Sequence, residues 1–196
     1  MNTKGNQSIR RMAYIAIFAA LSYTVFTFLQ FKIPLPGGDA TSIHLGNAVV
    51  VIAALLLGGL PGGLAGAIGM TIGDLFDPIY VVYAPKTFIC KLCIGLITGL
   101  VANKLGKLDA QKDPKQIMKW TVISAAAGLG FNVIADPLIG YFYKLVILGR
   151  SMADITLAWN VGASAINAGI SLVVASLIYI KLRPYAAHMG FKKSID

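Results

Sequence analysis

Long apolar runs recur along the whole chain, and they constrain its fold more than any other feature. Several approach the roughly 20 residues that an α-helix needs to cross a bilayer. Backbone polar groups find no water in hydrocarbon, so such runs form helices, whose hydrogen bonds are internal. We therefore predict an all-α membrane protein, a compact bundle of six transmembrane helices forming a single domain over residues 1–196. The expected helices cover about 10–31, 43–59, 61–80, 85–103, 117–147 and 155–182.

The composition excludes an ordinary soluble domain. Hydrophobic residues make up 57% of the 196, and the mean hydropathy is +0.73, whereas soluble domains are about 45–50% apolar. The net charge of +9 comes from 17 Lys and Arg against 8 acidic residues. These basic residues flank apolar runs instead of covering one face, so they indicate membrane topology and not a nucleic-acid partner.

The basic residues are distributed unequally between the two sides of the predicted membrane. With the N-terminus inside, twelve are cytoplasmic: Lys4, Arg10, Arg11, Lys104, Lys107, Lys112, Lys115, Lys119, Lys181, Arg183, Lys192 and Lys193. Three fall in external loops: Lys32, Lys144 and Arg150. Cytoplasmic loops of membrane proteins carry the excess of Lys and Arg, so both termini are predicted to be cytoplasmic.

Proline and glycine mark the breaks between the helices. Residues 33–38, Ile-Pro-Leu-Pro-Gly-Gly, should end the first helix, and residues 58–63 should form a tight hairpin between the second and third. The fifth helix is expected to protrude or to break near Pro137. Gly62, Gly66, Gly69 and Gly73 form a helical stripe in the third helix, which we interpret as a surface for close helix packing.

Polar residues inside the predicted spans gather toward the outer membrane face. Charged and amide groups are unfavourable in hydrocarbon, so they should face the bundle interior and meet one another or a ligand. The inner half offers almost no such groups, which favours a cavity open to the outside over a continuous pore. The candidate substrate-binding residues are His44, Asn47, Asp74, Tyr83, Lys86, Lys91, Asn132, Asp136, Trp159, Asn160 and Asn167.

Several of these residues also have a purely structural interpretation. Asn160 and Asn167 are equally well placed to hydrogen-bond between helices, and His44 to cap the second helix. For Lys91, the structural alternative to contacting the ligand or pairing with Asp74 is that its long stem extends outward to the membrane interface. The aromatic residues Tyr83 and Trp159 are typical of the membrane interface, where they also suit stacking on a flat ligand.

The sequence lacks the motifs of common energy-using and metal-using proteins. It has no glycine-rich loop ending in Gly-Lys-Ser or Gly-Lys-Thr, so the chain is not expected to hydrolyse ATP. No zinc-binding motif is present, and Cys90 and Cys93 are interpreted as small buried hydrophobic residues. We expect no metal, no cofactor and no enzymatic activity.

Four segments together resemble one protein family, the substrate-binding S components of energy-coupling factor (ECF) vitamin transporters. The resemblance is closest to the riboflavin-type and pyridoxine/hydroxymethylpyrimidine-type branch. The segments are Ile43-His44-Leu45-Gly46-Asn47, the glycine-rich residues 57–66, Gly73-Asp74-Leu75, and Tyr83-Ala84-Pro85-Lys86 continuing to Lys91.

The resemblance implies a multi-pass subunit of the bacterial cell membrane that captures a small water-soluble vitamin from outside. It also implies partners: a transmembrane coupling subunit and two cytoplasmic ATPase subunits, which use the ATP. Family members often dock through an Ala-x-x-x-Ala face on the first helix, which Ala16 and Ala20 match here. By the same resemblance, the 32–42 loop is expected to be a lid over the ligand.

Other functions remain open from the sequence alone. A pyridoxine, hydroxymethylpyrimidine or flavin-like vitamin suits the asparagines and Trp159, whereas Lys86 and Lys91 also suit an anionic vitamin such as pantothenate or lipoate. A self-sufficient transporter or channel is a further alternative. The last is an intramembrane enzyme using Asp74, Asp77 and His44.

Overall fold

The computed structural model describes residues 3–149 and 153–186, and it contains the six helices predicted from the sequence. The residues Arg150, Lys192 and Lys193 of the topology argument lie outside this described part. The α-helices are α1 (Thr3–Phe28), α2 (Gly46–Leu57), α3 (Gly59–Leu75), α4 (Ala84–Leu100), α5 (Pro114–Phe142) and α6 (Ala153–Ala186). The strands are β1 (Gln30–Leu35) and β2 (Asp39–His44). Short turns complete the chain: η1 (Val81–Tyr83), η2 (Val101–Leu105), η3 (Leu108–Ala110) and η4 (Tyr143–Ile147).

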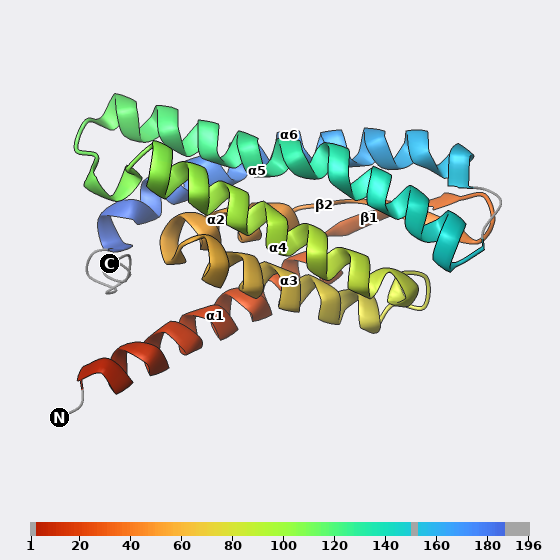
Figure 1. Cartoon of the computed structure of the whole chain (residues 1–196), viewed down its shortest axis with the longest axis horizontal. Coiled ribbons are helices and arrows are strands. Elements are labelled where there is room, and N and C mark those ends of the chain that lie inside the picture. The colour runs from red at the N-terminus through yellow and green to blue at the C-terminus, as the bar shows by residue number, and fades with distance from the viewer. Residues whose placement is uncertain (1–2, 150–152, 187–196) are drawn as a thin grey trace.

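Helix α2 is the centre of the bundle. Its residues from Gly46 to Leu56 are all buried, and α1, α3, α4 and α6 pack around it. Helix α1 is peripheral, and its N-terminal half projects away from the bundle (Figure 1). The start of α1 and the end of α6 lie at the same end of the molecule (Figure 1), as expected for an even number of crossings.

Four helices are long and apolar enough to cross a membrane. They correspond to Gln7–Phe28, Val81–Leu105, Pro114–Ile147 and Asp154–Ala186. Helix α2 is apolar but has only 12 residues, and α3 has 17. Both are shorter than the roughly 20 residues of a full crossing.

Glycines bring α3 unusually close to its neighbours. A Cβ atom at Gly95 of α4 would lie 2.2 Å from the Cα of Gly63, and one at Gly99 would lie 2.2 Å from the Cα of Gly59. On another face of α3, a Cβ at Gly62 would lie 2.2 Å from the backbone of Ala54 in α2. Only glycine permits such backbone contact, so the packing interpretation of the glycine stripe agrees with the structure.

A β-hairpin follows α1 where the sequence predicted only a loop. Strands β1 and β2 pair antiparallel, with Leu35 opposite Asp39 at the turn and Gln30 opposite His44 at the base. Gly37 and Gly38 adopt positive φ angles of 79° and 71° in the turn, a conformation that glycine adopts without strain. The hairpin explains why α1 ends at Phe28 and why α2 begins only at Gly46.

Other helix ends differ from the predicted bounds for local reasons. Helix α3 stops at Leu75 instead of continuing to 80, because Pro78 follows and the Asp77 carboxylate accepts the backbone N–H groups of Ile79 and Tyr80. Helix α5 begins at Pro114, capped by the side chain of Asp113. The expected break at Pro137 is absent, since α5 continues through it to Phe142 and then widens into the π-helical turn η4.

Candidate functional site

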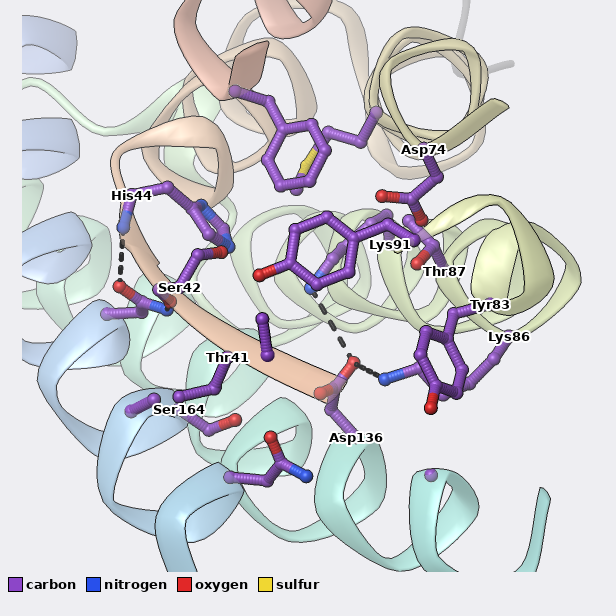
Figure 2. A pocket seen from close by; sticks show the side chains of 18 of the residues that line it. Thr41, Ser42, His44, Asp74, Tyr83, Lys86, Thr87, Lys91, Asp136 and Ser164 are labelled. Carbon is purple, nitrogen blue, oxygen red and sulfur yellow. Dashed lines mark hydrogen bonds and ion pairs between the residues drawn. The ribbon is translucent and has the colours of Figure 1, made fainter. Parts of the chain in front are cut away.

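One polar cavity lies at the end of the bundle beneath the hairpin, with walls from every helix and from β2 (Figure 2). The empty space between its lining atoms is about 720 Å³, including the part open to the surroundings. The room left for the centres of water molecules is only about 90 Å³. The lining residues are Phe26, Asp39, Ala40, Thr41, Ser42, His44, Asn47, Met70, Asp74, Tyr80, Tyr83, Lys86, Thr87, Lys91, Asn132, Asp136, Gly140, Lys144, Asn160, Ala163, Ser164 and Asn167.

Ten of the eleven residues predicted as ligand contacts line this cavity. They come from β2 and α2 (His44, Asn47), α3 (Asp74), η1 and α4 (Tyr83, Lys86, Lys91), α5 (Asn132, Asp136) and α6 (Asn160, Asn167). Helical spacing explains the convergence, because residues three, four or seven apart share a helix face. Whether they bind a ligand is a matter for the proposal below.

Trp159 is the exception and requires a correction. Its side chain is 53% exposed and borders a separate apolar groove together with Ile33, Ile43 and Ile166. It precedes Asn160 by one residue and therefore points about 100° away from the cavity face of α6. Its position agrees with the alternative assignment as an interface aromatic.

A carboxylate of α5 lies between two lysines of α4. The Asp136 Oδ1 atom is 3.2 Å from the Lys86 Nζ and 3.8 Å from the Lys91 Nζ (Figure 2). The side chains are largely buried, and Lys91 is only 6% exposed. The pairing of Lys91 with Asp74 that the sequence allowed is therefore not the one observed, since Lys91 turns to Asp136. Asp136 thus offsets one of the two positive charges of Lys86 and Lys91 from within the chain.

A second ion pair closes the cavity near the hairpin turn. Lys144 of η4 pairs with Asp39, the first residue of β2. The Lys144 Nζ also donates to the Thr156 Oγ1 at 3.0 Å, and the Tyr83 hydroxyl donates to Asp39 Oδ1 at 3.1 Å. The sequence assigned Lys144 to an external loop, which is wrong, because its side chain is buried.

Three buried amide or carboxylate oxygens on the cavity wall have neither a hydrogen-bond nor an ion-pair partner in the described structure. They are Oδ1 of Asn47, Oδ2 of Asp74 and Oδ1 of Asn132. The three side chains are between 1% and 3% exposed. Buried acceptors are normally satisfied, because an unpaired one is unfavourable by about 1–3 kcal/mol. Three in one cavity indicate a site that receives hydrogen-bond donors.

Asn167 and His44 have structural roles that the sequence left open. The Asn167 Oδ1 accepts the His44 backbone N–H at 2.8 Å, and its Nδ2 donates to the Ser42 carbonyl at 2.9 Å. Asn167 therefore ties α6 to the base of the hairpin while also lining the cavity. The His44 Nδ1 accepts the Gly46 N–H at 3.2 Å, a local turn at the start of α2, and the His44 ring packs edge-on against Phe26.

Asp77 lies outside the cavity, in the turn between α3 and η1, and it contacts the outer strand β1 of the hairpin. It pairs with Lys32 of β1, whose side chain is 37% exposed. Partial burial acts to raise the pKa of Asp77. Hydrogen bonds from Lys32 and from the Ile79 and Tyr80 backbone outweigh this effect and hold the pKa below its usual value. The structure thus gives Asp77 a helix-end role.

The sequence argument missed two charged residues of the site, Asp39 and Lys144. Asp39 follows the Gly37-Gly38 turn as the only acidic residue between the first two helices, and that isolation was a usable signal. Lys144 offered less, since a lone lysine near the end of a span is usually a topology signal. Among the described residues, no group of three His, Cys, Asp or Glu side chains is placed to hold a metal ion.

Comparisons with known proteins place this geometry in a family. The profile of the family described as "ECF-type riboflavin transporter, S component" matches residues 6–184. A crystal structure of the S component for biotin from an ECF-type ABC transporter superposes with a TM-score of 0.62 at 18% identity, over 94% of this chain and 95% of that one. No curated protein matches the sequence.

The chain is thus a membrane-embedded binding subunit of a transporter. It belongs to the ECF-type riboflavin transporter S-component family. Its fold is the S-component fold, at an identity to the biotin protein too low to carry over a ligand. Membership makes it a multi-pass, non-enzymatic component of the cell membrane that works with an energy-coupling module.

Proposed function

We propose that this chain captures riboflavin, or a closely related neutral flavin, from outside the cell and delivers it to an ATP-driven coupling module. The observation that carries the proposal is the set of three unpartnered buried oxygens on the wall of one cavity. A flavin offers donors suited to them, the ring imide N–H and the hydroxyl groups of its sugar-alcohol chain. The family to which the chain belongs supports a flavin.

The charge balance of the cavity favours a neutral ligand over pantothenate or lipoate. Its lining includes three lysines, Lys86, Lys91 and Lys144, and three aspartates, Asp39, Asp74 and Asp136. Each lysine already lies within ion-pair distance of an aspartate. An anionic vitamin would add a further negative charge beside these carboxylates in a poorly solvated space, which is unfavourable.

The test is direct binding to the purified chain in detergent or nanodiscs. Riboflavin fluorescence should be quenched on binding, and flavin should be identified by mass spectrometry in extracts of the purified protein. Replacing Asn132 with Leu should weaken binding about 10-fold or more, because a donor of the ligand loses its acceptor. Trp159→Leu is the matched control outside the cavity and should bind normally.

A wild-type chain that leaves riboflavin fluorescence unchanged while binding pyridoxine or hydroxymethylpyrimidine would contradict the flavin assignment. Vesicles that contain only this chain should accumulate no flavin. Accumulation there would instead favour a self-sufficient transporter.

We further propose that the coupling subunit docks on the outer face of α1. A groove of about 510 Å³ between α1 and α3 is lined by Met12, Ile15, Ala16, Ala19, Ala20, Tyr23, Ile68 and Ile72. Ala16 and Ala20 are exposed, and small residues allow a helix of the partner to approach closely. Because α1 packs mainly through its C-terminal half, this groove remains accessible from the membrane.

Replacing Ala16 and Ala20 with Trp should leave flavin binding intact and prevent assembly with the coupling subunit in pull-down experiments. Ile17→Trp is the control, because Ile17 is 59% exposed and lies outside the groove. Normal assembly of the Ala16/Ala20 variant would refute this docking face.

A further inference from the structure

The hairpin covers the cavity with one strand only. Asp39, Ala40, Thr41, Ser42 and His44 of β2 line the cavity, whereas no residue of β1 does. Most of β2 is accordingly buried, and most of β1 is exposed or half-buried. A ligand bound in this cavity would therefore lie against β2.

Polar contacts among the described residues hold the hairpin to the helices at three places along it. At the base, Asn167 of α6 binds both Ser42 and His44. At the turn, Asp39 pairs with Lys144 of η4 and accepts a hydrogen bond from the Tyr83 hydroxyl. On the outer strand, Lys32 pairs with Asp77.

The Lys144–Asp39 pair at the turn is more deeply buried than the Lys32–Asp77 pair. The Lys144 and Asp39 side chains are 6% and 3% exposed, against 37% and 12% for Lys32 and Asp77. Lys144 also gathers segments that are distant in sequence, since it bonds Thr156 at the start of α6 and lies 5.5 Å from the Tyr83 ring centroid. Breaking a buried pair leaves an uncompensated charge, whereas breaking an exposed one has little effect.

We infer that the Lys144–Asp39 pair is the catch of the hairpin and sets the rate at which bound ligand leaves. The inference rests on the proposed function of ligand capture and adds to it the residues that control release. The base stays attached through Asn167 while the turn moves outward, so that opening requires Asp39 to separate from Lys144 and from the Tyr83 hydroxyl. The Lys32–Asp77 pair contributes little, because water already competes for both of its members.

Release kinetics of riboflavin test the catch. In stopped-flow fluorescence, Lys144→Met should release flavin at least about 10-fold faster than wild type, because loss of a buried partner acts mainly on the dissociation rate. Lys32→Met is the matched control and should change the rate less than about 3-fold. Lys144→Arg retains the charge and should stay near wild type.

A double-mutant comparison separates the catch from general damage. Asp39→Asn should accelerate release in the wild-type background and add less than about 2-fold in Lys144→Met, because the pair is already broken. Full additivity of the two changes would overturn the inference. An equal effect of Lys32→Met would do so as well.

Hydrogen exchange in ligand-free protein gives an independent measurement. Backbone amides of residues 39–42 should exchange at least about 10-fold faster in Lys144→Met than in wild type or in Lys32→Met. Unchanged exchange in Lys144→Met would refute the catch. A wild-type chain that binds no flavin would refute the proposed function instead, and this experiment would still decide the catch.

Discussion

The two ends of the bundle are built on opposite principles. Beneath the hairpin, charged and amide side chains from α2 to α6, from η4 and from β2 surround a cavity. At the other end, α2 is enclosed in an apolar cluster that includes Val51, Leu55, Ile94, Leu129 and Tyr179. Between them, glycines hold α3 against α4 at backbone contact. At the polar end, the hydrogen-bond and ion-pair partners of the side chains can be replaced by groups of a ligand. At the apolar end, the side chains have no other arrangement that packs as densely.

The largest expected effect is at the close-packed region. Gly95→Leu should prevent stable folding, because its first added carbon would already lie 2.2 Å from the Gly63 Cα. The measurement is the yield of monodisperse protein in size-exclusion chromatography and its unfolding temperature. Gly130→Leu is the control, since nothing lies within 4 Å of a Cβ at Gly130. Equal behaviour of the two variants would contradict the rigid packing assigned to the α3–α4 contact.

A smaller loss of stability is expected when the charge of the polar end is unbalanced. Asp136→Asn leaves Lys86 and Lys91 without their shared carboxylate, and removal of one member of a buried pair destabilises by about 3–5 kcal/mol. Because these side chains retain some exposure, we expect the lower end of that range. Thermal unfolding measures the change, with the exposed Asp109→Asn as control. An unfolding temperature equal to wild type would show that water already solvates Lys86 and Lys91 well enough to replace the Asp136 carboxylate.

The tie at the base of the hairpin should contribute less. Asn167→Leu removes the partners of the His44 N–H and the Ser42 carbonyl, which should lower the free energy of unfolding by about 1–3 kcal/mol. Asn160→Leu, two turns earlier on the same helix, is the matched control and should lower it less. If both variants lose stability equally, Asn167 is a ligand contact only and does not anchor the hairpin.

The smallest effect concerns acid and the exposed pair of the outer strand. The folded pKa of Asp77 lies below its usual value, so its contribution is present above that usual value and is lost as the pH falls through the lower, folded one. Below about pH 4, the protection of β1 amides, measured relative to their intrinsic exchange rates at the same pH, should therefore fall in wild type and less so in Asp77→Asn. A similar fall in both would assign the acid response to another group.

Hydropathy and the depth of polar residues were sufficient to predict the six helices and most of the cavity. Both depend on the transfer of individual groups into hydrocarbon, which a sequence reports directly. Asp39 and Lys144 were missed because their meaning depends on a contact between segments far apart in the chain. The hairpin was missed for a related reason. A two-stranded ribbon containing Pro34 has little stability of its own, and it is held here by ties to three other parts of the chain.

The connection between β2 and α2 is very short. Strand β2 ends at His44, α2 begins at Gly46, and only Leu45 lies between them. Gly46 is itself enclosed, with the Met70 side chain 3.1 Å from where its Cβ would stand. Helix α2 is therefore fixed, and an outward movement of the hairpin is expected to be a rotation about a hinge at Leu45. The displacement of a residue then grows with its distance from Leu45, so the entrance widens first at the hairpin turn, where Asp39 lies.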